Sequence, residues 1–312
     1  SGSDAVSGGF MSWYEELDRW TADYLPDMIY EHDAALAKYT SFRIGGPADY
    51  LIYLENEDQL CRIQKYLRLV DVPYTVIGNG SNLLVSDDGY RGIVLVIGKY
   101  MSEITVKDCY LEAEAGALMS QVAKTAKEHG LTGLEFAAGI PGTVGGGTVM
   151  NAGAYGGEMS QVVSTVTVVN RNGEIMELDN GTMEFGYRTS VIQNQPFVVT
   201  KVTFRLEQGD PEQIAEKMAD LAKRRREKQP LEYPSAGSTF KRPAGHFAGQ
   251  LIMESGLRGY SVGGAKVSEK HCGFIINTGN ATAEDVKDVI WEVQRRVKER
   301  FQVDLEPEIK FL

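Results

Sequence analysis

A glycine-rich stretch in the middle of the chain constrains its fold more than any other feature. Residues 139–158 read GIPGTVGGGTVMNAGAYGGE, with eight glycines in twenty positions, and apolar segments flank them on both sides. Glycine has no Cβ, so it adopts positive φ angles and lets the backbone approach a ligand closely. Successive backbone N–H groups in such a loop converge on an anion. The stretch therefore predicts a binding loop, with a diphosphate as its expected ligand.

Neither of the two common phosphate-binding motifs matches this chain. Gly142 and Gly147 have the spacing of a P-loop, but Thr148 occupies the position of the lysine. Upstream, residues 78–83 read GNGSNL, and Leu83 replaces the third glycine of the Rossmann motif. A tight connection between strands is the alternative interpretation of the central stretch taken alone.

Length and charge limit the classes of protein to which the chain belongs. Its 312 residues predict two or three packed units, each with its own core. The net charge of −11 argues against nucleic-acid binding, because such binding requires a basic surface. No apolar run approaches the roughly 20 residues that a membrane span needs, so we expect a soluble protein without membrane insertion.

The cysteines and histidines predict neither disulfides nor a metal site. Cys61, Cys109 and Cys272 are odd in number and far apart, and no CxxC pair or secretory signal is present, which favours a reducing cytosol. Each is expected to be a small buried apolar residue without a catalytic role. The four histidines show no metal-ligand spacing such as HExxH.

Periodicity predicts a succession of helices and strands along the chain. Residues 1–10 are polar and glycine-rich and are expected to be an expression remnant ahead of a native start at Met11. Ser12 and Glu15 form a capping-box pattern at the start of an amphipathic helix. The further predicted elements are a strand, a helix and two strands over 48–97, a strand at 110–115, a helix ending near Gly130, strands at 162–169, 175–178 and 197–206, a helix that starts at Pro211 and ends in the basic run 223–226, a helix carrying Val286 to Val297, and a strand at 305–311.

Six further stretches carry a resemblance to a known family. They read TSFRIGGPAD at 40–49, VIGNGSNLLVSD at 76–87, GYRTS at 186–190, EKQPLEYPSAGSTFKRP at 227–243, VGGAKVSEKHCGFIIN at 262–277 and LEPEIKF at 305–311. Together with the central stretch they resemble, in the same order, the bacterial UDP-N-acetylenolpyruvylglucosamine reductases.

The resemblance implies an α+β fold, with a two-lobed FAD-binding domain of the vanillyl-alcohol-oxidase-like type and a C-terminal α+β substrate domain. The expected boundaries are 11–98 for the first lobe, joined by the C-terminal strand at 304–312, then 99–209 for the second lobe and 210–303 for the substrate-binding domain. It also implies noncovalent FAD, held by Arg43, Ile44, Gly45, Gly46, Ile77, Gly78, Asn79, Gly80, Ser81, Asn82, Leu83, Gly139, Gly142, Thr143, Gly145, Gly146, Asn151, Gly153 and Ala154.

The implied activity is NADPH-dependent reduction of UDP-N-acetylglucosamine enolpyruvate to UDP-N-acetylmuramate, in cytoplasmic peptidoglycan precursor synthesis. This chemistry requires a hydride donor over one carbon, stabilisation of charge on the substrate carboxylate, and a proton for the other carbon. The resemblance assigns charge stabilisation to Arg188, whose planar fork suits a carboxylate. It assigns proton donation to Ser238 and a third catalytic position to Glu308. Beside the substrate carboxylate, Glu308 must be protonated or held against a cation such as Arg188. Lys310, two residues further on and on the same face of a strand, is the other candidate for that cation.

The resemblance also implies substrate-binding residues, namely Tyr155, Tyr187, Arg225, Lys228, Arg242, Gln250 and Lys310. Only residues 189–196 separate Arg188 from the next predicted strand, which is too short for the tyrosine-bearing insertion of one family branch. The chain therefore resembles the short-loop branch, and its substrate clamp must differ. Cys272 departs from the alanine usual at its position and is expected to be a tolerated core residue.

Alternatives stay open at this point. Judged by spacing alone, Arg188 reads as a surface ion pair and Ser238 as a turn residue. The enzymatic alternative is another flavoprotein oxidase of the same architecture. Many such oxidases attach FAD covalently through a histidine in a glycine-rich loop, but residues 43–49 and 139–158 contain no histidine or cysteine. A non-catalytic nucleotide-sugar sensor is disfavoured because the predicted catalytic residues are all present.

Overall fold

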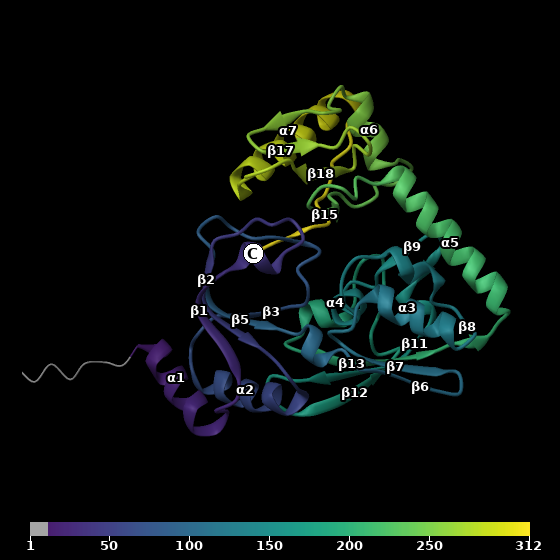
Figure 1. The fold of residues 1–312 in the computed structure, drawn as a ribbon. Helices are drawn as coiled ribbons and strands as arrows, with labels where there is room; N and C mark the ends of the chain where they lie inside the picture. Colours follow the sequence, from purple (N-terminus) through teal and green to yellow (C-terminus); the bar gives the residue numbers. More distant parts are fainter. Residues whose placement is uncertain (1–11) are drawn as a thin grey trace, which may run out of the picture.

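The computed structural model describes residues 12–312, and the expression remnant expected at 1–10 lies outside the described residues. Two lobes lie side by side, and a C-terminal domain lies above them in the view of Figure 1. A long helix, α5 (Pro211–Lys228), runs along one side from the second lobe up to the C-terminal domain.

Lobe 1 contains a four-stranded sheet in the order β1-β2-β5-β3, in which β1 is an antiparallel edge strand and the other pairs are parallel. Its elements are α1 Trp13–Tyr24, β1 Ile29–Ala35, β2 Pro47–Tyr53, α2 Glu57–Leu69, β3 Tyr74–Ile77, β4 Leu83–Leu84 and β5 Tyr90–Val96. The hydroxyl of Ser12 caps α1 by accepting the N–H of Glu15 at 3.4 Å, as the capping pattern predicts. The sequence pattern missed β1 because five of its seven residues are exposed.

Lobe 2 contains a five-stranded antiparallel sheet in the order β12-β11-β13-β7-β6. Its elements are β6 Ile104–Lys107, β7 Tyr110–Glu114, α3 Met119–Glu128, β11 Val163–Val169, β12 Ile175–Asp179 and β13 Val198–Arg205, with a small pair formed by β8 Leu131–Thr132 and β14 Glu207–Gln208. Val166 and Val202 are fully buried on the inner face. Alternating valines of this kind are what predicted the strands.

The glycine-rich stretch was predicted as a loop, but it contains a short helix, α4 (Val144–Val149). Thr143 caps this helix by accepting the N–H of Gly146 at its Oγ1, at 3.3 Å. A Cβ at Gly145 would lie 2.9 Å from the Cβ of Ala115, so only glycine lets α4 pack directly beyond the end of β7. Tertiary packing here overrides the low helix propensity of glycine.

Helix α5 begins at Pro211 after the Asp210 cap, as predicted, but it differs from the prediction in two ways. It continues beyond the basic run to Lys228. It was expected to open the C-terminal domain, whereas it contacts α3 and β8 of lobe 2, with Met218 packed against their core. Because its apolar face covers lobe 2, the C-terminal domain starts near residue 229 rather than at 210.

The C-terminal domain contains an antiparallel sheet in the order β15-β18-β17-β16. Its elements are β15 Ser235–Ser238, α6 Ala248–Glu254, β16 Ser261–Val262, β17 Ala265–Val267, β18 Phe274–Asn277 and α7 Ala283–Phe301. The chain then returns to lobe 1, where β19 (Lys310–Phe311) pairs in parallel with β4. The strand predicted at 305–311 is therefore only two residues long, and Pro307 before it makes a single bridge to Phe240.

Short helical turns and one hairpin complete the described elements. The turns are the 3-10 helices η1 Leu36–Tyr39, η2 Lys99–Met101, η3 Glu135–Gly139, η4 Met159–Gln161 and η5 Val191–Asn194. The hairpin joins β9 (Gly153–Ala154) to β10 (Gly157–Glu158). Its two central residues, Tyr155 and Gly156, have φ of +51° and +81°, as a tight two-residue hairpin turn requires.

Two buried clusters tie the three units together. One joins lobe 1 side chains such as Leu60 to lobe 2 side chains such as Val122 in a single core. The other combines the C-terminal domain with Phe42, Ile44 and Leu84 of lobe 1. A fully buried side chain of this kind contributes roughly 1.5–3 kcal/mol of transfer free energy. The three units therefore keep fixed positions around the segments that meet between them.

The cysteines only partly follow the prediction of small buried residues. Cys272 is 6% exposed within the C-terminal core, as predicted. Cys61 and Cys109 are half-buried at the edge of the core that the two lobes share.

Candidate active site

Two neighbouring cavities meet where the lobes and the C-terminal domain come together. The larger, of about 910 Å³, is lined by parts of 76–83, 139–155 and 229–238. The smaller, of about 850 Å³, lies between the β9–β10 hairpin and the C-terminal domain. The residues that line both cavities are Gly153, Ala154, Tyr155, Arg188, Ser238, His271 and Glu308. All three predicted catalytic residues thus lie at the junction.

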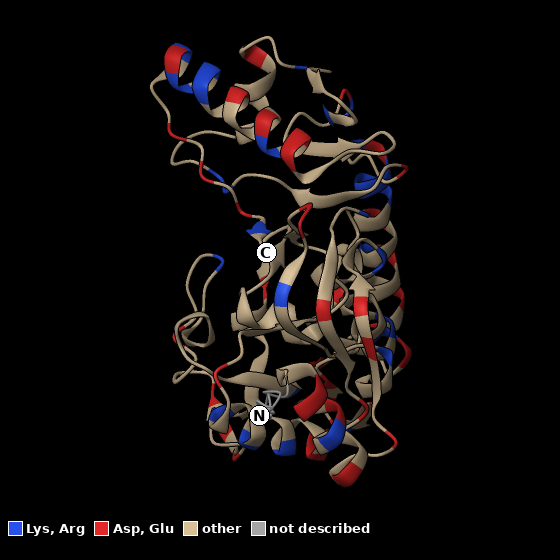
Figure 2. Ribbon diagram, turned by 90° about the vertical axis from the view of Figure 1, so that its left-hand side faces the viewer, with Lys and Arg blue, Asp and Glu red and all other residues tan. Residues whose placement is uncertain are grey.

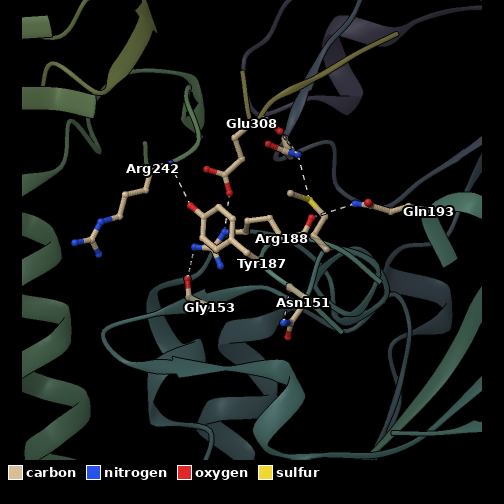
Figure 3. A network of polar contacts seen from close by, with 10 residues as sticks. Asn151, Gly153, Tyr187, Arg188, Gln193, Arg242 and Glu308 are labelled. Atoms are coloured by element: carbon tan, nitrogen blue, oxygen red, sulfur yellow. Dashed lines mark hydrogen bonds and ion pairs between the residues drawn. The ribbon is translucent and has the colours of Figure 1, made fainter. Parts of the chain in front are cut away.

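An ion pair between Arg188 and Glu308 forms the centre of this junction (Figure 3). The Nε of Arg188 donates to Oε1 of Glu308 at 2.7 Å, and one terminal nitrogen donates to the carbonyl oxygen of Gly153 at 3.0 Å. The exposed fractions of the two charged side chains are 23% and 14%. Because a guanidinium carries five N–H donors, Arg188 keeps donor capacity for a ligand that enters either cavity.

Arg188 occupies a backbone conformation that is uncommon for a residue with a side chain. Its φ is +52°, and such a left-handed conformation costs of order 1–3 kcal/mol. The amide of Asn151 holds the turn by donating to the carbonyl oxygen of Gly186 at 2.8 Å. Strain of this kind persists only where the surroundings fix it, and it is common at active sites.

Burial raises the pKa of Glu308, and the positive charges of Arg188 and Lys241 oppose that rise. Of the two cations that the sequence suggested for Glu308, Arg188 pairs with it and Lys310 does not. The prediction for Lys310 assumed a strand through both residues, but the strand starts only at Lys310. Lys310 instead lines the larger cavity.

Ser238 lies at the end of β15, directly after an irregularity in the sheet. Ser235 is opposite Ile276 and Ser238 is opposite Phe274, so three steps along β15 match two along β18. Gly237 inside this bulge has φ of +73°, which favours glycine. Bulges redirect side chains, and Ser238 here is exposed to both cavities.

The larger cavity fits FAD in size and in the construction of its wall. Its volume lies near the top of the roughly 300–1,000 Å³ range of ligand pockets. The predicted cofactor residues on its wall are Arg43, Ile77, Gly78, Asn79, Gly80, Ser81, Asn82, Leu83, Gly139, Gly142, Thr143, Gly146, Gly153 and Ala154. A Cβ at Gly78 would collide with Thr143, and one at Gly142 would lie 2.7 Å from Oγ of Ser81. Glycine therefore lets the two loops cross in direct contact.

The charge of the larger cavity also fits a diphosphate. Its lining contains four cations and two carboxylates, namely Arg43, Arg188, Arg225, Lys310, Glu232 and Glu308. In a protein with a net charge of −11 this is a local reversal of sign. Along the helices and strands drawn in Figure 2, acidic and basic residues are interspersed. Cations near a phosphate supply charge-assisted hydrogen bonds.

Five predicted cofactor residues are not part of the cavity wall, and close packing surrounds them. Ile44 is 2% exposed in the C-terminal core. A Cβ at Gly45 would lie 2.8 Å from Cβ of Val85. Similar close packing explains the remaining residues: Gly46 lies against the backbone of Asp87, Gly145 against Ala115, and Asn151 is fully buried with bonds to Gly186 and Ser160.

The smaller cavity contains four of the predicted substrate residues, Tyr155, Tyr187, Arg242 and Gln250. The hydroxyl of Tyr187 accepts the backbone N–H of Arg242 at 3.1 Å, which joins lobe 2 to the C-terminal domain (Figure 3). The guanidinium of Arg242 lies 4.3 Å from the ring centroid of Phe247. Sequence reasoning missed Phe247 and two further cations on this wall, Arg258 and Lys270.

The two predicted substrate residues on α5, Arg225 and Lys228, lie outside the smaller cavity. Arg225 lines the larger cavity, so it is on the predicted cofactor side rather than the substrate side. Burial lowers its pKa, and its Nε donates to Oε1 of Gln229 at 3.2 Å. Lys228 is exposed at the end of α5, outside the walls of both cavities.

His271 is the titratable residue of the junction that sequence reasoning missed. Its Nδ1 accepts the backbone N–H of Gly273 at 3.0 Å, so the ring proton of the neutral form is on Nε2. Burial lowers the pKa of His271 and favours that neutral form. Its motif was recognised, but nothing in the spacing indicated that it faces both cavities.

Across residues 12–312, no group of three or more His, Cys, Asp or Glu side chains is arranged to hold a metal ion. No helix in this part of the chain is both long and apolar enough to cross a membrane.

Two family models match the chain. One describes the C-terminal domain of UDP-N-acetylenolpyruvoylglucosamine reductase and matches residues 229–312, and the other describes an FAD-binding domain and matches residues 48–179. The UDP-N-acetylenolpyruvoylglucosamine reductase of Caldanaerobacter subterraneus subsp. tengcongensis is 52% identical over 277 residues, which cover 89% of this chain and 91% of that protein. The enzyme of the same name from Clostridium perfringens strain SM101 is 47% identical over 302 residues, covering 97% and 99%.

A solved structure shows the same architecture. The crystal structure of UDP-N-acetylenolpyruvylglucosamine reductase from Thermus caldophilus matches with a TM-score of 0.78 at 36% identity, over 91% of this chain and 98% of that one. The predicted α+β fold, with an FAD-binding domain and a separate C-terminal domain, is confirmed. On identity over most of its length, the chain belongs to the UDP-N-acetylenolpyruvoylglucosamine reductase family.

Proposed function

We propose that this protein reduces UDP-N-acetylglucosamine enolpyruvate to UDP-N-acetylmuramate, with FAD as cofactor and NADPH as reductant. The observation that carries the proposal is the meeting of Arg188, Ser238 and Glu308 at the junction of a large and a smaller cavity. The proposal includes a role in peptidoglycan precursor synthesis in the cytoplasm. FAD, when bound in the larger cavity, supplies the hydride that adds to the methylene carbon of the enolpyruvyl group.

Arg188 stabilises the substrate carboxylate as negative charge develops on it. Its guanidinium is already oriented, because Glu308 and the carbonyl oxygen of Gly153 each accept one of its N–H groups. A preoriented cation stabilises developing charge without reorganising first. Its planar fork also matches a carboxylate in a way that a lysine does not.

Glu308 orients Arg188 without repelling the substrate. An ionised carboxylate next to the substrate carboxylate would be unfavourable unless a cation lies between them. Arg188 is that cation, at 2.7 Å from Glu308.

Ser238 donates the proton to the second carbon of the former double bond. A hydroxyl is a weak acid, but the enolate-like species left after hydride addition is strongly basic, so a stronger acid is unnecessary. The exposed position of Ser238 at both cavities supports this role. Hydride and proton together saturate the double bond.

A two-step spectroscopic experiment tests the function. Protein reconstituted with excess FAD should be yellow, bleach with NADPH, and regain its flavin absorbance when UDP-N-acetylglucosamine enolpyruvate is added without oxygen. UDP-N-acetylglucosamine, which lacks the enolpyruvyl group, is the matched control and should not restore the colour. Recovery with neither compound would contradict the proposal.

The same preparation tests how the cofactor is held. Denaturation should release all of the flavin into the supernatant, because the loops at 43–49 and 139–158 contain no histidine or cysteine for covalent attachment. Flavin that stays with the precipitated chain would favour a covalent oxidase of the same architecture.

A further inference from the structure

We propose that Thr239 is a positioning residue that sets the positions of Ser238 and Glu308 relative to each other. This proposal rests on the proposed function. Thr239 lies directly behind the junction of the two cavities and is only 2% exposed. It follows Ser238 in the chain, and its carbonyl oxygen accepts the backbone N–H of Glu308 at 2.8 Å. Ser238 and Glu308 are therefore both attached to one buried residue, the first by the chain and the second by a backbone hydrogen bond.

Three hydrogen bonds fix Thr239 against two other segments. Its N–H donates to the carbonyl oxygen of Gly273 at 2.9 Å, and its carbonyl oxygen is bonded to Glu308. Its side-chain Oγ1 accepts the N–H of Ile275 at 3.1 Å. The side chain thus ties the segment after β15 to β18, while the backbone ties it to the segment that carries Glu308.

The bulge in β15 explains why a side-chain acceptor is needed here. The regular pairing between β15 and β18 shifts between Ser235 and Ser238. Beyond that shift, the amide of Ile275 bonds to a hydroxyl on the facing segment. Because Thr239 is the first residue after β15 and directly follows Ser238, this bond holds the end of the bulge in the conformation that turns Ser238 toward the cavities.

The segment of Glu308 is attached to the same place by a short ladder. The N–H of Lys241 donates to the carbonyl oxygen of Glu306 at 2.8 Å, and Phe240 bridges to Pro307. With the bond from Glu308 to Thr239, these contacts make residues 239–241 and 306–308 move as one. A shift at Thr239 therefore displaces Ser238 and Glu308 together, relative to Arg188 on lobe 2.

Valine in place of Thr239 isolates the hydroxyl, because it keeps the shape and removes the acceptor. Ile275 is 1% exposed, so its N–H would have no water to replace the lost bond. The local backbone must then shift to satisfy the donor. Serine keeps the acceptor and loses only a methyl group.

The experiment compares Thr239→Val, Thr239→Ser and the control Thr200→Val. Thr200 is also 2% exposed, but its hydroxyl donates to Glu57 at 2.6 Å, at the contact between the two lobes. In Thr239→Val, substrate-driven reoxidation of the flavin should slow by at least roughly tenfold, while NADPH-driven reduction stays within about threefold. Thr239→Ser should recover the reoxidation rate. Thr200→Val should lose thermal stability and keep both rates.

Hydrogen exchange in the cofactor-free protein gives a second readout. The amides of Ile275 and Glu308 should exchange faster in Thr239→Val than in wild type. In Thr200→Val their exchange rates should equal those of wild type. If the valine variant does not fold, Thr239→Ala, which leaves space for a water to accept from Ile275, is measured in the same way.

Two outcomes would overturn the role of Thr239. One is a wild-type reoxidation rate in the valine variant, and the other is an equal loss in both the Thr239 and Thr200 variants. A wild-type protein that reduces with NADPH but never reoxidises with the enolpyruvyl substrate would instead refute the proposed function, and the positioning role with it.

Discussion

Asp87 of lobe 1 caps a helix of the C-terminal domain by accepting the N–H of Ala283 at 2.8 Å, across 196 residues of sequence. Its second carboxylate oxygen accepts the N–H of Glu284 at 3.1 Å. Because both donors belong to the first turn of α7, Asp87→Ala should lower the free energy of unfolding by about 1–2 kcal/mol. Asp88→Ala removes a neighbouring carboxylate without this cap and should change stability little. Thermal or urea unfolding of both variants checks the difference.

Replacement of Arg188 by lysine should separate the two halves of the reaction. The ammonium of lysine lacks the planar fork that bonds Glu308 and Gly153 and still matches the substrate carboxylate, so the enolpyruvyl half-reaction should lose ~2–4 kcal/mol of transition-state stabilisation. Bleaching by NADPH should be much less affected. Rapid-mixing absorbance follows both halves, and equal loss in each would indicate a general binding or folding defect.

Replacement of Ser238 by alanine should remove the proposed proton donor alone. FAD binding and reduction by NADPH should stay near normal, while reoxidation by substrate slows by orders of magnitude. Ser238→Cys should keep part of that rate, since a thiol also has a proton to give. Near-normal reoxidation in the alanine variant would mean that water or another side chain delivers the proton.

His271 predicts an acid-sensitive contribution to stability. Its pKa is lowered by burial in the folded protein from the ordinary value of 6.5, so the unfolded chain takes up the proton first as the pH falls. The contribution of His271 to stability is complete above about pH 6.5 and is lost as the pH falls through the folded-state pKa. His271→Asn keeps an acceptor for Gly273 and should remove this pH dependence. Unfolding of the cofactor-free protein over this pH range measures the pH dependence of stability. The control is His246→Asn, because His246 is exposed.

Gly146 allows a prediction in which stability and cofactor affinity move in opposite directions. An added Cβ would have only Oγ1 of Thr143 within 4 Å, at 3.6 Å, so alanine fits α4. Helix propensity should then raise the stability of the cofactor-free protein by up to about 1 kcal/mol. The methyl group would also enter the larger cavity, whose wall Gly146 lines, and weaken FAD binding. Unchanged FAD affinity by fluorescence titration would place the cofactor elsewhere in the cavity.

The parts of the fold that the sequence predicted are those in which side chains alternate or cap. Val166 and Val202 face a core, and Ser12 and Asp210 cap the helices that follow them. The parts that it missed depend on tertiary contact. β1 is mostly exposed, and α4 is rich in glycine and exists because it packs beyond β7.

The candidate site shows the same division. Motif resemblance indicated the chemistry of Arg188, Ser238 and Glu308, and the structure brings these residues together. It did not distinguish a glycine that faces a ligand from one that lets two segments of chain touch, so Gly45 was assigned to the cofactor although Val85 covers it. Nor did it find His271, because facing both cavities depends on how two distant segments meet.

The hydrophobic core of the C-terminal domain is completed by Phe42, Ile44 and Leu84, which come from lobe 1. Residues 229–312 are therefore not a transferable module. A chimera that combines this C-terminal domain with the two N-terminal lobes of a relative must carry over 42–46 and 83–87 as well, so that the apolar partners and the Asp87 cap are retained. Recombination at the apparent boundary alone would expose apolar surface and leave α7 without its cap, and grafting of substrate specificity between relatives has to follow packing rather than chain order.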